Sequence, residues 1–310
     1  MLPFIDGHTL QELLDPESLI SALRLGFVGS ASAPPRSHVS LPRDSGVPDT
    51  LLMMPAWNED VLGIKLATIH PGNVDLGLPP VHASYVLKDR QTGQDLALMD
   101  GAVLTRLRTA AASALAADYA ARSDASTLLM VGAGSLAIPL IEAHCAVRPI
   151  KRILLWNRSR DRAHAVVAAS ERTIELVDDL DAVVSHADII SCATLSTEPL
   201  VRGDRVAAGT HVDLVGAYRP DMRESDADLI ARAAVFVDTY EGARQEAGDL
   251  LLAANETAWS LDRIQADLAV LCRGAHPGRS DPEEITVFKS VGASIEDLVA
   301  AALAWDRYQA

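Results

Sequence analysis

The sequence predicts an α/β fold, with a Rossmann-type doubly wound parallel sheet and a smaller α+β substrate and dimerisation domain. Three observations support this prediction: a glycine-rich turn between a short strand and a helix, strands and helix-sized intervals alternating up to residue 238, and mainly extended segments before residue 100. Alternating strands and helices predict parallel strands joined by right-handed crossovers. We expect residues 1–120 and 292–310 to form the substrate-binding domain, and residues 121–291 the dinucleotide-binding domain.

The first domain is expected to contain a small, mostly antiparallel sheet. Apolar residues recur at helical spacing over residues 16–27, which predicts a helix, whereas residues 30–48 are rich in Pro and Ser and predict a loop or an edge strand. Strands are expected over residues 3–5, 50–55, 61–69 and 82–88, with turns at 71–73 and 91–93. The alanine-rich residues 104–121 predict a helix. A last helix over 295–308 can return to pack on this domain.

The second domain begins where the pattern changes, after residue 123. Short apolar strands are expected over residues 128–131, 152–156, 173–177, 188–192, 211–215 and 234–238. Helices are expected to follow the first two strands, up to residue 146 and over 161–170. The spacing of the remaining strands leaves room for further crossovers.

Composition restricts the class of protein. The chain has 310 residues, of which 49% are hydrophobic and 22% charged, which excludes a disordered or fibrous protein. Its 42 acidic and 27 basic residues give a net charge of −15, and this charge repels polyanions. We therefore expect no nucleic-acid partner, and we expect an anionic substrate to need local basic residues.

Cysteine usage and hydropathy predict a cytoplasmic protein. The three cysteines are too widely spaced for a disulfide framework, and neither they nor the nine histidines show metal-ligand spacing. No metal site is expected. The N-terminal residues lack a signal-peptide pattern, and no apolar run approaches the roughly 20 residues that span a bilayer. We expect no membrane association.

A glycine-rich turn predicts a dinucleotide site. Residues 132–137, Gly-Ala-Gly-Ser-Leu-Ala, follow a strand and open a helix. Gly132 permits the tight turn, Gly134 lets the backbone approach a pyrophosphate, and a small third residue lets helix and strand pack closely. Ser135 and Leu136 stand at the helix N-terminus, whose free N–H groups attract phosphate. The alternating context strengthens an otherwise weak motif.

The end of the second strand of this domain indicates the type of dinucleotide. NAD-selective domains usually carry an acidic residue there, which binds the ribose 2′-hydroxyl. This chain instead has Asn157, Arg158, Ser159 and Arg160. The two guanidiniums can bind a 2′-phosphate. We expect NADP(H) to be preferred, with NAD(H) also possible; a solvated basic turn is the alternative.

Basic residues in the first domain are candidate substrate ligands. Lys65 lies within an apolar strand, where Gly63 and Ala67 share its face and should leave space around it. Arg36 lies in a Pro-rich segment, and Arg108 in the alanine-rich helix. From spacing alone, an outward-facing lysine and a helix-surface arginine are the more common interpretations.

Several blocks, in order, resemble the ornithine cyclodeaminase/mu-crystallin family. They are GIKLAT, the PGN turn, TGQDLALMDG, LTRLRTAAASALAA, GAGSLA, WNRSR, VGAYRPDMRE and TVFKSVG. The similarity covers nearly the whole chain. It implies a homodimer, with a substrate and dimerisation domain closed by the C-terminal helix and a Rossmann domain for NAD(P).

The resemblance also assigns roles to single residues. Lys65 matches the family's active-site lysine, and Arg36 and Arg108 match residues that hold the substrate carboxylate. The implied cofactor-binding residues are Arg108, Thr109, Gly132, Gly134, Ser135, Leu136, Asn157, Arg158, Ser159, Arg160, Thr194, Val215, Gly216 and Ser290. A bidentate guanidinium can fix a planar carboxylate and orient its α-carbon.

One departure from the family favours one activity. Ornithine cyclodeaminases and related archaeal alanine dehydrogenases carry an aspartate where this chain has Tyr218, expected here to line the substrate pocket. Family members that reduce ketimines also lack the aspartate. The resemblance therefore implies an NAD(P)H-dependent reductase of cyclic ketimines, converting Δ1-pyrroline-2-carboxylate to L-proline and Δ1-piperideine-2-carboxylate to L-pipecolate. Ornithine cyclodeaminase, an alanine- or opine-type dehydrogenase and a non-catalytic ligand binder are the alternatives.

Overall fold

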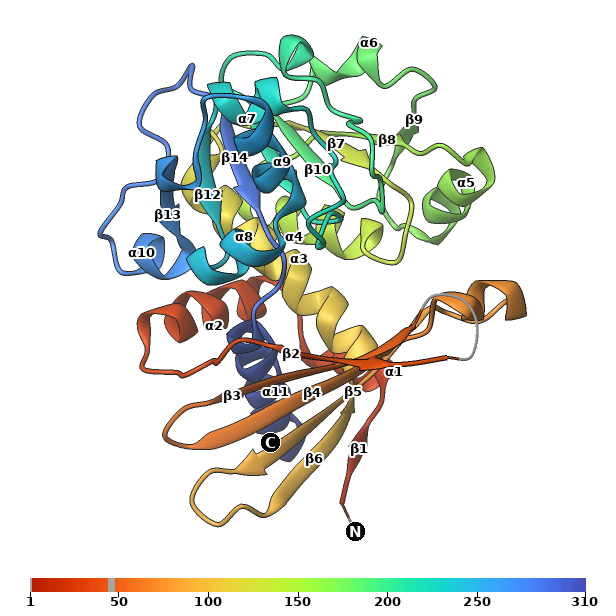
Figure 1. The fold of residues 1–310 in the computed structure, drawn as a ribbon, viewed down its shortest axis with the longest axis vertical. Helices are drawn as coiled ribbons and strands as arrows, with labels where there is room; N and C mark the ends of the chain where they lie inside the picture. Colours follow the sequence, from red (N-terminus) through yellow and green to blue (C-terminus); the bar gives the residue numbers. More distant parts are fainter. Residues whose placement is uncertain (1, 44–47) are drawn as a thin grey trace. The chain divides into compact units, whose positions relative to one another are not determined.

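The computed structural model describes residues 2–43 and 48–310, except for the side chains of residues 74 and 75. Residues 44–47 of the predicted loop or edge strand lie outside the described residues. The chain divides into two compact units, Met1–Thr109 with Ala293–Ala310, and Ala110–Gly292 (Figure 1). Helix α3 (Gly101–Ala120) belongs to both units. The first unit ends in the middle of this helix, at residue 109, whereas the sequence analysis placed the boundary at its end, at residue 120.

The first unit is built on one six-stranded sheet. Neighbouring strands are antiparallel, except that β1 and β6 are parallel. The strands lie in the order β1 (Phe4–Ile5), β6 (Asp95–Asp100), β5 (Val81–Asp89), β4 (Val61–Ile69), β3 (Asp49–Trp57) and β2 (Ser37–Leu41). The sheet agrees with the expected mostly antiparallel arrangement, and β2 is the edge strand.

Helices cover one face of this sheet. They are α1 (Gly7–Leu13), α2 (Pro16–Val28), the first part of α3 and α11 (Ser294–Gln309). Asp6 and Asp15 cap the first two helices by accepting hydrogen bonds from Thr9 N and Ser18 N, each at 2.9 Å. Helix α11 packs against β3, β4, β5 and α2. The last helix therefore returns to the first unit, as its apolar stripe predicts.

The two faces of the sheet differ sharply in burial. Antiparallel register aligns Met54, Lys65, Tyr85 and Met99 in one row across four strands, and all four side chains are buried. The alternate residues point to the opposite face, where they are half-buried or exposed. Lys65 thus lies on the helix-covered face.

The second unit is built on an eight-stranded parallel sheet. The strands lie in the order β13 (Ile264–Asp267), β12 (Ala234–Val237), β14 (Thr286–Lys289), β11 (His211–Leu214), β10 (Ile189–Cys192), β7 (Thr127–Val131), β8 (Arg152–Trp156) and β9 (Glu175–Leu176). Its central strands are fully buried, as expected when both faces of a parallel sheet are covered, and they carry buried polar residues such as Asp213 and Thr286 beside their apolar ones. The predicted α/β class is confirmed.

Short helices connect these strands. They are α4 (Ala137–Val147), α5 (Arg160–Ala169), α6 (Asp181–Val184), α7 (Ala227–Arg232), α8 (Tyr240–Glu246), α9 (Gly248–Glu256) and α10 (Leu268–Cys272), with 3-10 turns η2 (Gly203–Arg205) and η3 (Leu261–Arg263). Among the described helices of the chain, none is both long and apolar enough to cross a membrane.

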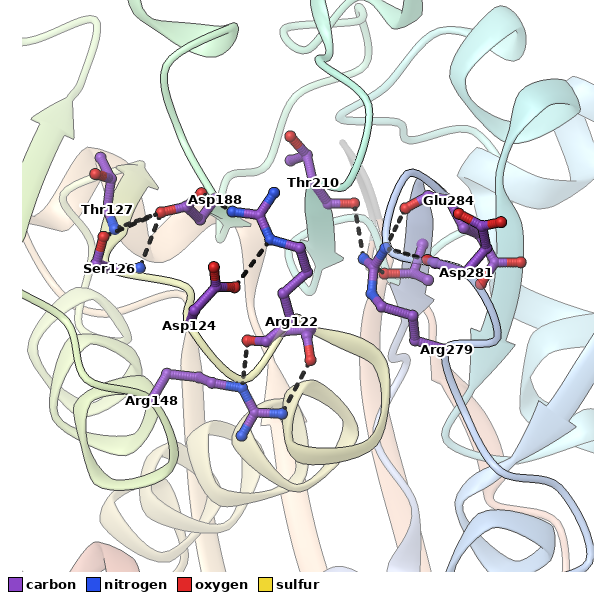
Figure 2. Close-up of polar contacts among 12 residues, drawn as sticks. Arg122, Asp124, Ser126, Thr127, Arg148, Asp188, Thr210, Arg279, Asp281 and Glu284 are labelled. Atoms are coloured by element: carbon purple, nitrogen blue, oxygen red, sulfur yellow. Dashed lines mark hydrogen bonds and ion pairs between the residues drawn. The ribbon is translucent and has the colours of Figure 1, made fainter.

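Arginines join the C-terminal end of α3 to the strands of the second unit (Figure 2). Arg148 Nε donates to the carbonyl oxygen of Arg122 at 2.9 Å, and Arg122 Nη2 donates to Asp188 Oδ1 at 2.6 Å. Arg279 Nη2 donates to the carbonyl oxygen of Thr210 at 3.3 Å. Residues 188 and 210 directly precede β10 and β11, so these contacts fix the chain after α3 against the sheet. The open helix end itself is satisfied by Arg148 Nη2, which donates to the carbonyl oxygens of Ala117 and Ala121 at 2.8 and 3.0 Å, and by Arg279 Nε, which donates to that of Ala120 at 2.8 Å.

Several elements were not expected from the sequence. Helix α1 has only seven residues, too few for a clear period, and β6, β13 and β14 are short strands close to helices. The turn predicted at residues 71–73 is wrong in type, because these residues begin a 3-10 helix, η1 (Pro71–Leu76). Strand β4 begins and ends as predicted.

Candidate functional site

Four charged side chains of the first unit form a buried ionic cluster: Lys65, Arg108, Glu296 and Asp297. Lys65 Nζ lies 2.8 Å from Asp297 Oδ2, and Arg108 Nε donates to Asp297 Oδ1 at 2.8 Å. Arg108 Nη1 donates to Glu296 Oε2 at 2.5 Å. None of the four side chains is more than 5% exposed. Two cations and two carboxylates make the cluster electrically balanced.

Three elements bring these residues together. Strand β4 carries Lys65, α3 carries Arg108, and the first turn of α11 carries both carboxylates. A carboxylate in the first turn of a helix is favoured by the free N–H groups and the positive end of the helix dipole. Helix α11 therefore presents its acids at the position where burial of the lysine and the arginine requires opposite charge.

Burial and neighbouring charges set the protonation of Lys65. Burial lowers the pKa of Lys65, and the nearby Arg108 lowers it as well, whereas Asp297 and Glu296 raise it; together they leave this pKa at about 8. Burial by itself raises the pKa of Asp297, but Arg108 and Lys65 overcome it and hold this pKa below its ordinary value. The pKa of Arg108 is raised by the two carboxylates. Lys65 is thus the member of the cluster that can exchange a proton near neutral pH.

The expected free space beside Lys65 is partly filled. The prediction that Gly63 leaves space around the lysine is wrong, because the ring of Tyr85 occupies that position. A Cβ atom on Gly63 would lie 1.8 Å from the Tyr85 hydroxyl oxygen. This hydroxyl is buried and has no hydrogen-bond partner among the described residues. Glycine at 63 is therefore needed for the packing of Tyr85.

The ordinary alternatives for Lys65 and Arg108 do not hold. Lys65 is 4% exposed and Arg108 is 3% exposed, so neither is a surface residue.

Arg36 is half-buried and directly precedes β2, whose Ser37 is paired with Met53. The two carboxylates of α11 were missed by the sequence analysis. The sequence carries one signal for them. Asp297 lies on the same apolar stripe of the helix as Ala300, Ala301 and Ala304, where a charged residue is out of place.

The glycine turn of the second unit connects β7 to α4. Gly132 has a φ of +114°, a conformation that favours glycine, and a Cβ there would lie 2.7 Å from the carbonyl oxygen of Ala193. In contrast, no heavy atom lies within 4 Å of the position of a Cβ on Gly134. No side chain caps the N-terminus of α4 at Leu136. The exposed Gly134 and Ser135 and this open helix end fit a phosphate-binding turn.

Residues after β8 support the same turn. Asn157 Oδ1 accepts a hydrogen bond from Ala133 N at 3.0 Å, and its Nδ2 donates to the carbonyl oxygen of Ser159 at 2.8 Å. Ser159 also caps α5. Arg160 pairs with Asp178 at 2.9 Å, both exposed, whereas Arg158 is exposed and forms no ion pair within the described ranges. Of the two arginines, Arg158 is the one available to a ligand.

Glu224 holds the loops that follow β10 and β11. Its carboxylate accepts hydrogen bonds from Thr194 N at 2.6 Å, Thr194 Oγ1 at 2.8 Å and Gly216 N at 2.6 Å. A Cβ on Gly216 would lie 1.8 Å from the carbonyl oxygen of Thr194, so glycine allows the two loops to meet. Asp249 accepts from Glu224 N at 2.7 Å and pairs with the buried Lys289 at 3.0 Å. Burial raises the pKa of Glu224, opposed by Lys289.

The other predicted residues lie in or near the same elements. Val215 is buried after β11, and Tyr218 is half-buried three residues later. Ser290 is buried and donates to Asp238 Oδ2 at 3.1 Å. Thr109 is buried within α3. Among the described residues, no group of three or more His, Cys, Asp or Glu side chains is arranged to hold a metal ion.

Comparison with known proteins covers nearly the whole chain. A model of the ornithine cyclodeaminase/mu-crystallin family matches residues 8–310. A Δ1-pyrroline-2-carboxylate reductase from Colwellia psychrerythraea is 39% identical over 307 residues, which cover 97% of each chain. The ketimine reductase mu-crystallin of Rattus norvegicus is 35% identical over 294 residues, 94% of this chain and 90% of the relative.

Solved structures agree with the fold. The Δ1-pyrroline-2-carboxylate reductase of Thermococcus litoralis, in complex with NADH and L-proline, is similar with a TM-score of 0.92 and 33% identity, covering 100% of this chain and 98% of that one. An archaeal alanine dehydrogenase dimer with bound NAD has a TM-score of 0.90 and 29% identity, covering 99% and 96%.

Replacing Glu224 tests its function as a loop clamp. In Glu224→Gln, an amide NH2 takes the place of one of the carboxylate oxygens, so a buried donor loses its acceptor. We expect the free energy of unfolding to fall by about 2 kcal/mol. Urea denaturation measures it, with the exposed Glu198→Gln of the same region as control, expected to change by less than about 0.5 kcal/mol. Equal stability of the two variants contradicts the clamp.

Proposed function

Because this chain belongs to the ornithine cyclodeaminase/mu-crystallin family, we propose that it is an NAD(P)H-dependent oxidoreductase that reduces cyclic ketimines. The proposed reactions convert Δ1-pyrroline-2-carboxylate to L-proline and Δ1-piperideine-2-carboxylate to L-pipecolate. The main support is similarity over nearly the full length to proteins named as such reductases. The buried Lys65, which can exchange a proton near neutral pH, suits this chemistry.

The first unit supplies the groups that bind and protonate the imino acid. Lys65 gives a positive charge and an N–H donor on the covered face of the sheet. Arg108 uses Nε and Nη1 for Asp297 and Glu296, whereas its Nη2 forms no hydrogen bond with the described residues. We assign the substrate carboxylate to this remaining edge of Arg108, together with Arg36 and Lys65.

Reduction of a ketimine needs one hydride and one proton. The reduced nicotinamide supplies the hydride to C2 when it is bound. As C2 accepts the hydride, the C=N electron pair moves to the ring nitrogen, which takes a proton from Lys65 Nζ. Lys65 then regains a proton from water. Tyr218 stands where an aspartate would assist deamination, and a phenol in place of a carboxylate removes the proton acceptor that deamination would use.

The second unit supplies the dinucleotide site. Gly132, Gly134, Ser135 and Leu136 form a turn with space for a pyrophosphate at an uncapped helix end. Thr194, Val215 and Gly216, on the loops held by Glu224, are assigned to the nicotinamide half. Thr109 and Ser290 are assigned as further cofactor contacts. Asn157, Arg158, Ser159 and Arg160 are assigned to the adenosine ribose, with NADP(H) preferred through Arg158.

A homodimer is part of the proposal. On the sheet face opposite Lys65, Val39, Leu41 and Leu66 are 37–40% exposed, and Met53 and Ile64 are half-buried between them. These residues lie on the adjacent strands β2, β3 and β4 and form one apolar surface, which suits an interface with a second copy of the chain. A cytoplasmic location is also proposed, which the three free cysteines favour.

Steady-state assays test the activity. We expect purified protein to oxidise NADPH or NADH when Δ1-pyrroline-2-carboxylate or Δ1-piperideine-2-carboxylate is added. Lys65→Met should lose more than about 100-fold in kcat, since the proton donor is gone, while NADPH binding stays within about twofold. Incubation with L-ornithine and NAD+ should release no ammonia. Ammonia and proline formed stoichiometrically from ornithine would instead establish a cyclodeaminase.

Binding of the two cofactors tests the assignment of Arg158. Arg158→Asp removes the expected partner of the 2′-phosphate and adds repulsion, so we expect NADPH binding to weaken by about 2 kcal/mol, roughly 30-fold. NADH binding should change little. Calorimetry measures both, and Arg202→Ala is the control because Arg202 is an exposed arginine of the same unit that is not assigned to the cofactor. A wild-type preference for NADH of tenfold or more contradicts this assignment.

Light scattering tests the dimer. Leu66→Asp places a charge at the centre of the apolar sheet face, so we expect a shift from dimer to monomer at micromolar concentration. Leu25→Asp is the matched control, since Leu25 is 73% exposed but lies on α2, away from this face. A wild-type monomer, or an unchanged dimer in Leu66→Asp, would exclude this face as the interface.

A further inference from the structure

We propose that Asp297 is a positioning residue that keeps Lys65 protonated and aimed for proton donation, while Arg108 holds the other oxygen of the same carboxylate in place. This inference rests on the proposed reductase function and extends it to the α11 carboxylates. Asp297 is not assigned to touch substrate or cofactor. It acts on the reaction through the ammonium group of Lys65.

The two oxygens of Asp297 divide their contacts between the two cations. Oδ2 lies 2.8 Å from Lys65 Nζ, and Oδ1 accepts from Arg108 Nε at 2.8 Å. Since the Arg108 guanidinium is planar and also binds Glu296, it restrains the plane of the Asp297 carboxylate. The lysine is therefore held by a carboxylate that is itself held from the other side.

Glu296 provides an internal contrast. It is the neighbour of Asp297 in the same helical turn and is equally buried, and it binds Arg108 at 2.5 Å. Glu296 favours the ammonium form of Lys65 more weakly than Asp297 does, because it acts through its charge alone and not through a hydrogen bond as well. The two acids thus separate two tasks: Asp297 binds both cations, and Glu296 balances the charge of the arginine.

Among the described residues, the charged groups that act on Lys65 lie on α3 and α11, and Arg36, which shares the proposed carboxylate site, directly precedes β2. Arg108 on α3 disfavours the ammonium form, whereas Asp297 and Glu296 on α11 favour it. Tyr85 on β5, directly across from Lys65, is neutral because burial and Asp297 raise its pKa. Without the charge of Asp297, burial and Arg108 lower the pKa of Lys65, and Glu296 is the remaining described neighbour that opposes them. The pKa of Lys65 must then fall below about 8.

The consequence for the reaction has a definite sign. The donor is the ammonium form, so the rate of imine reduction falls as pH rises through the pKa of Lys65. A lower pKa moves this loss to lower pH. Neutralising Asp297 lowers the pKa of Lys65, so imine reduction is lost at a lower pH than in the wild type. Neutralising Arg108 raises the pKa of Lys65, so the loss occurs at a higher pH.

Lysine NMR of the whole protein tests the inference without any activity. The chain has four lysines, Lys65, Lys88, Lys151 and Lys289, so ¹³Cε signals from labelled lysine are few, and Lys65→Met identifies one of them. We expect the Lys65 titration midpoint to fall by about one pH unit or more in Asp297→Asn. Glu296→Gln, the matched control, should shift it by less than half as much. An unchanged midpoint in Asp297→Asn overturns the proposal.

Two further measurements keep the test decisive if Asp297→Asn folds poorly. Arg108→Gln should move the Lys65 midpoint upward, and Asp297→Glu should restore most of the wild-type value. The alkaline limb of kcat/KM against pH should move in the same directions as the midpoints. Titration of the imine itself affects all variants equally and cancels. Absence of imine reduction in wild type refutes the proposed function, whereas active variants with unshifted profiles refute only the inference about Asp297.

Discussion

The first unit depends on the neutralisation of two buried cations by carboxylates that lie far from them in the sequence. Lys65 and Arg108 lie beneath helices, where an unpaired charge costs several kcal/mol. Their partners, Asp297 and Glu296, are separated from Arg108 by 189 and 188 positions. The return of α11 is therefore more than apolar packing. Without its acids, the lysine would be driven out of the site or held neutral.

A different constraint shapes the second unit, where backbone must meet backbone. Gly132 approaches the segment after β10, and Gly216 approaches Thr194 in the same segment. Glu224 then ties the loops after β10 and β11 by accepting three hydrogen bonds. The result is a fixed platform at the carboxyl ends of the strands, the place where parallel sheets bind ligands.

The features that could be predicted from the sequence are those that depend on a few neighbouring residues. Strand β4, the glycine turn after β7 and the cationic candidates Lys65 and Arg108 each have a period, a motif or an out-of-place charge within a few residues. Asp297 carries only one such signal, its place on the apolar stripe of α11, and Glu224 carries none, because a polar loop also contains acids. Their significance depends on partners that only the tertiary fold supplies, just as the space expected beside Gly63 is taken by Tyr85 from the next strand.

On the proposed assignment, the cluster also favours a direction of reaction. A lysine with a pKa of about 8 is roughly nine-tenths protonated at pH 7, so it is ready to give a proton and poor at taking one. Reduction of a preformed C=N bond needs such a donor once per turnover. Oxidative deamination needs a base on the amine, and Tyr218 is not one. The same buried charges that complete the fold therefore suit the site to reduction.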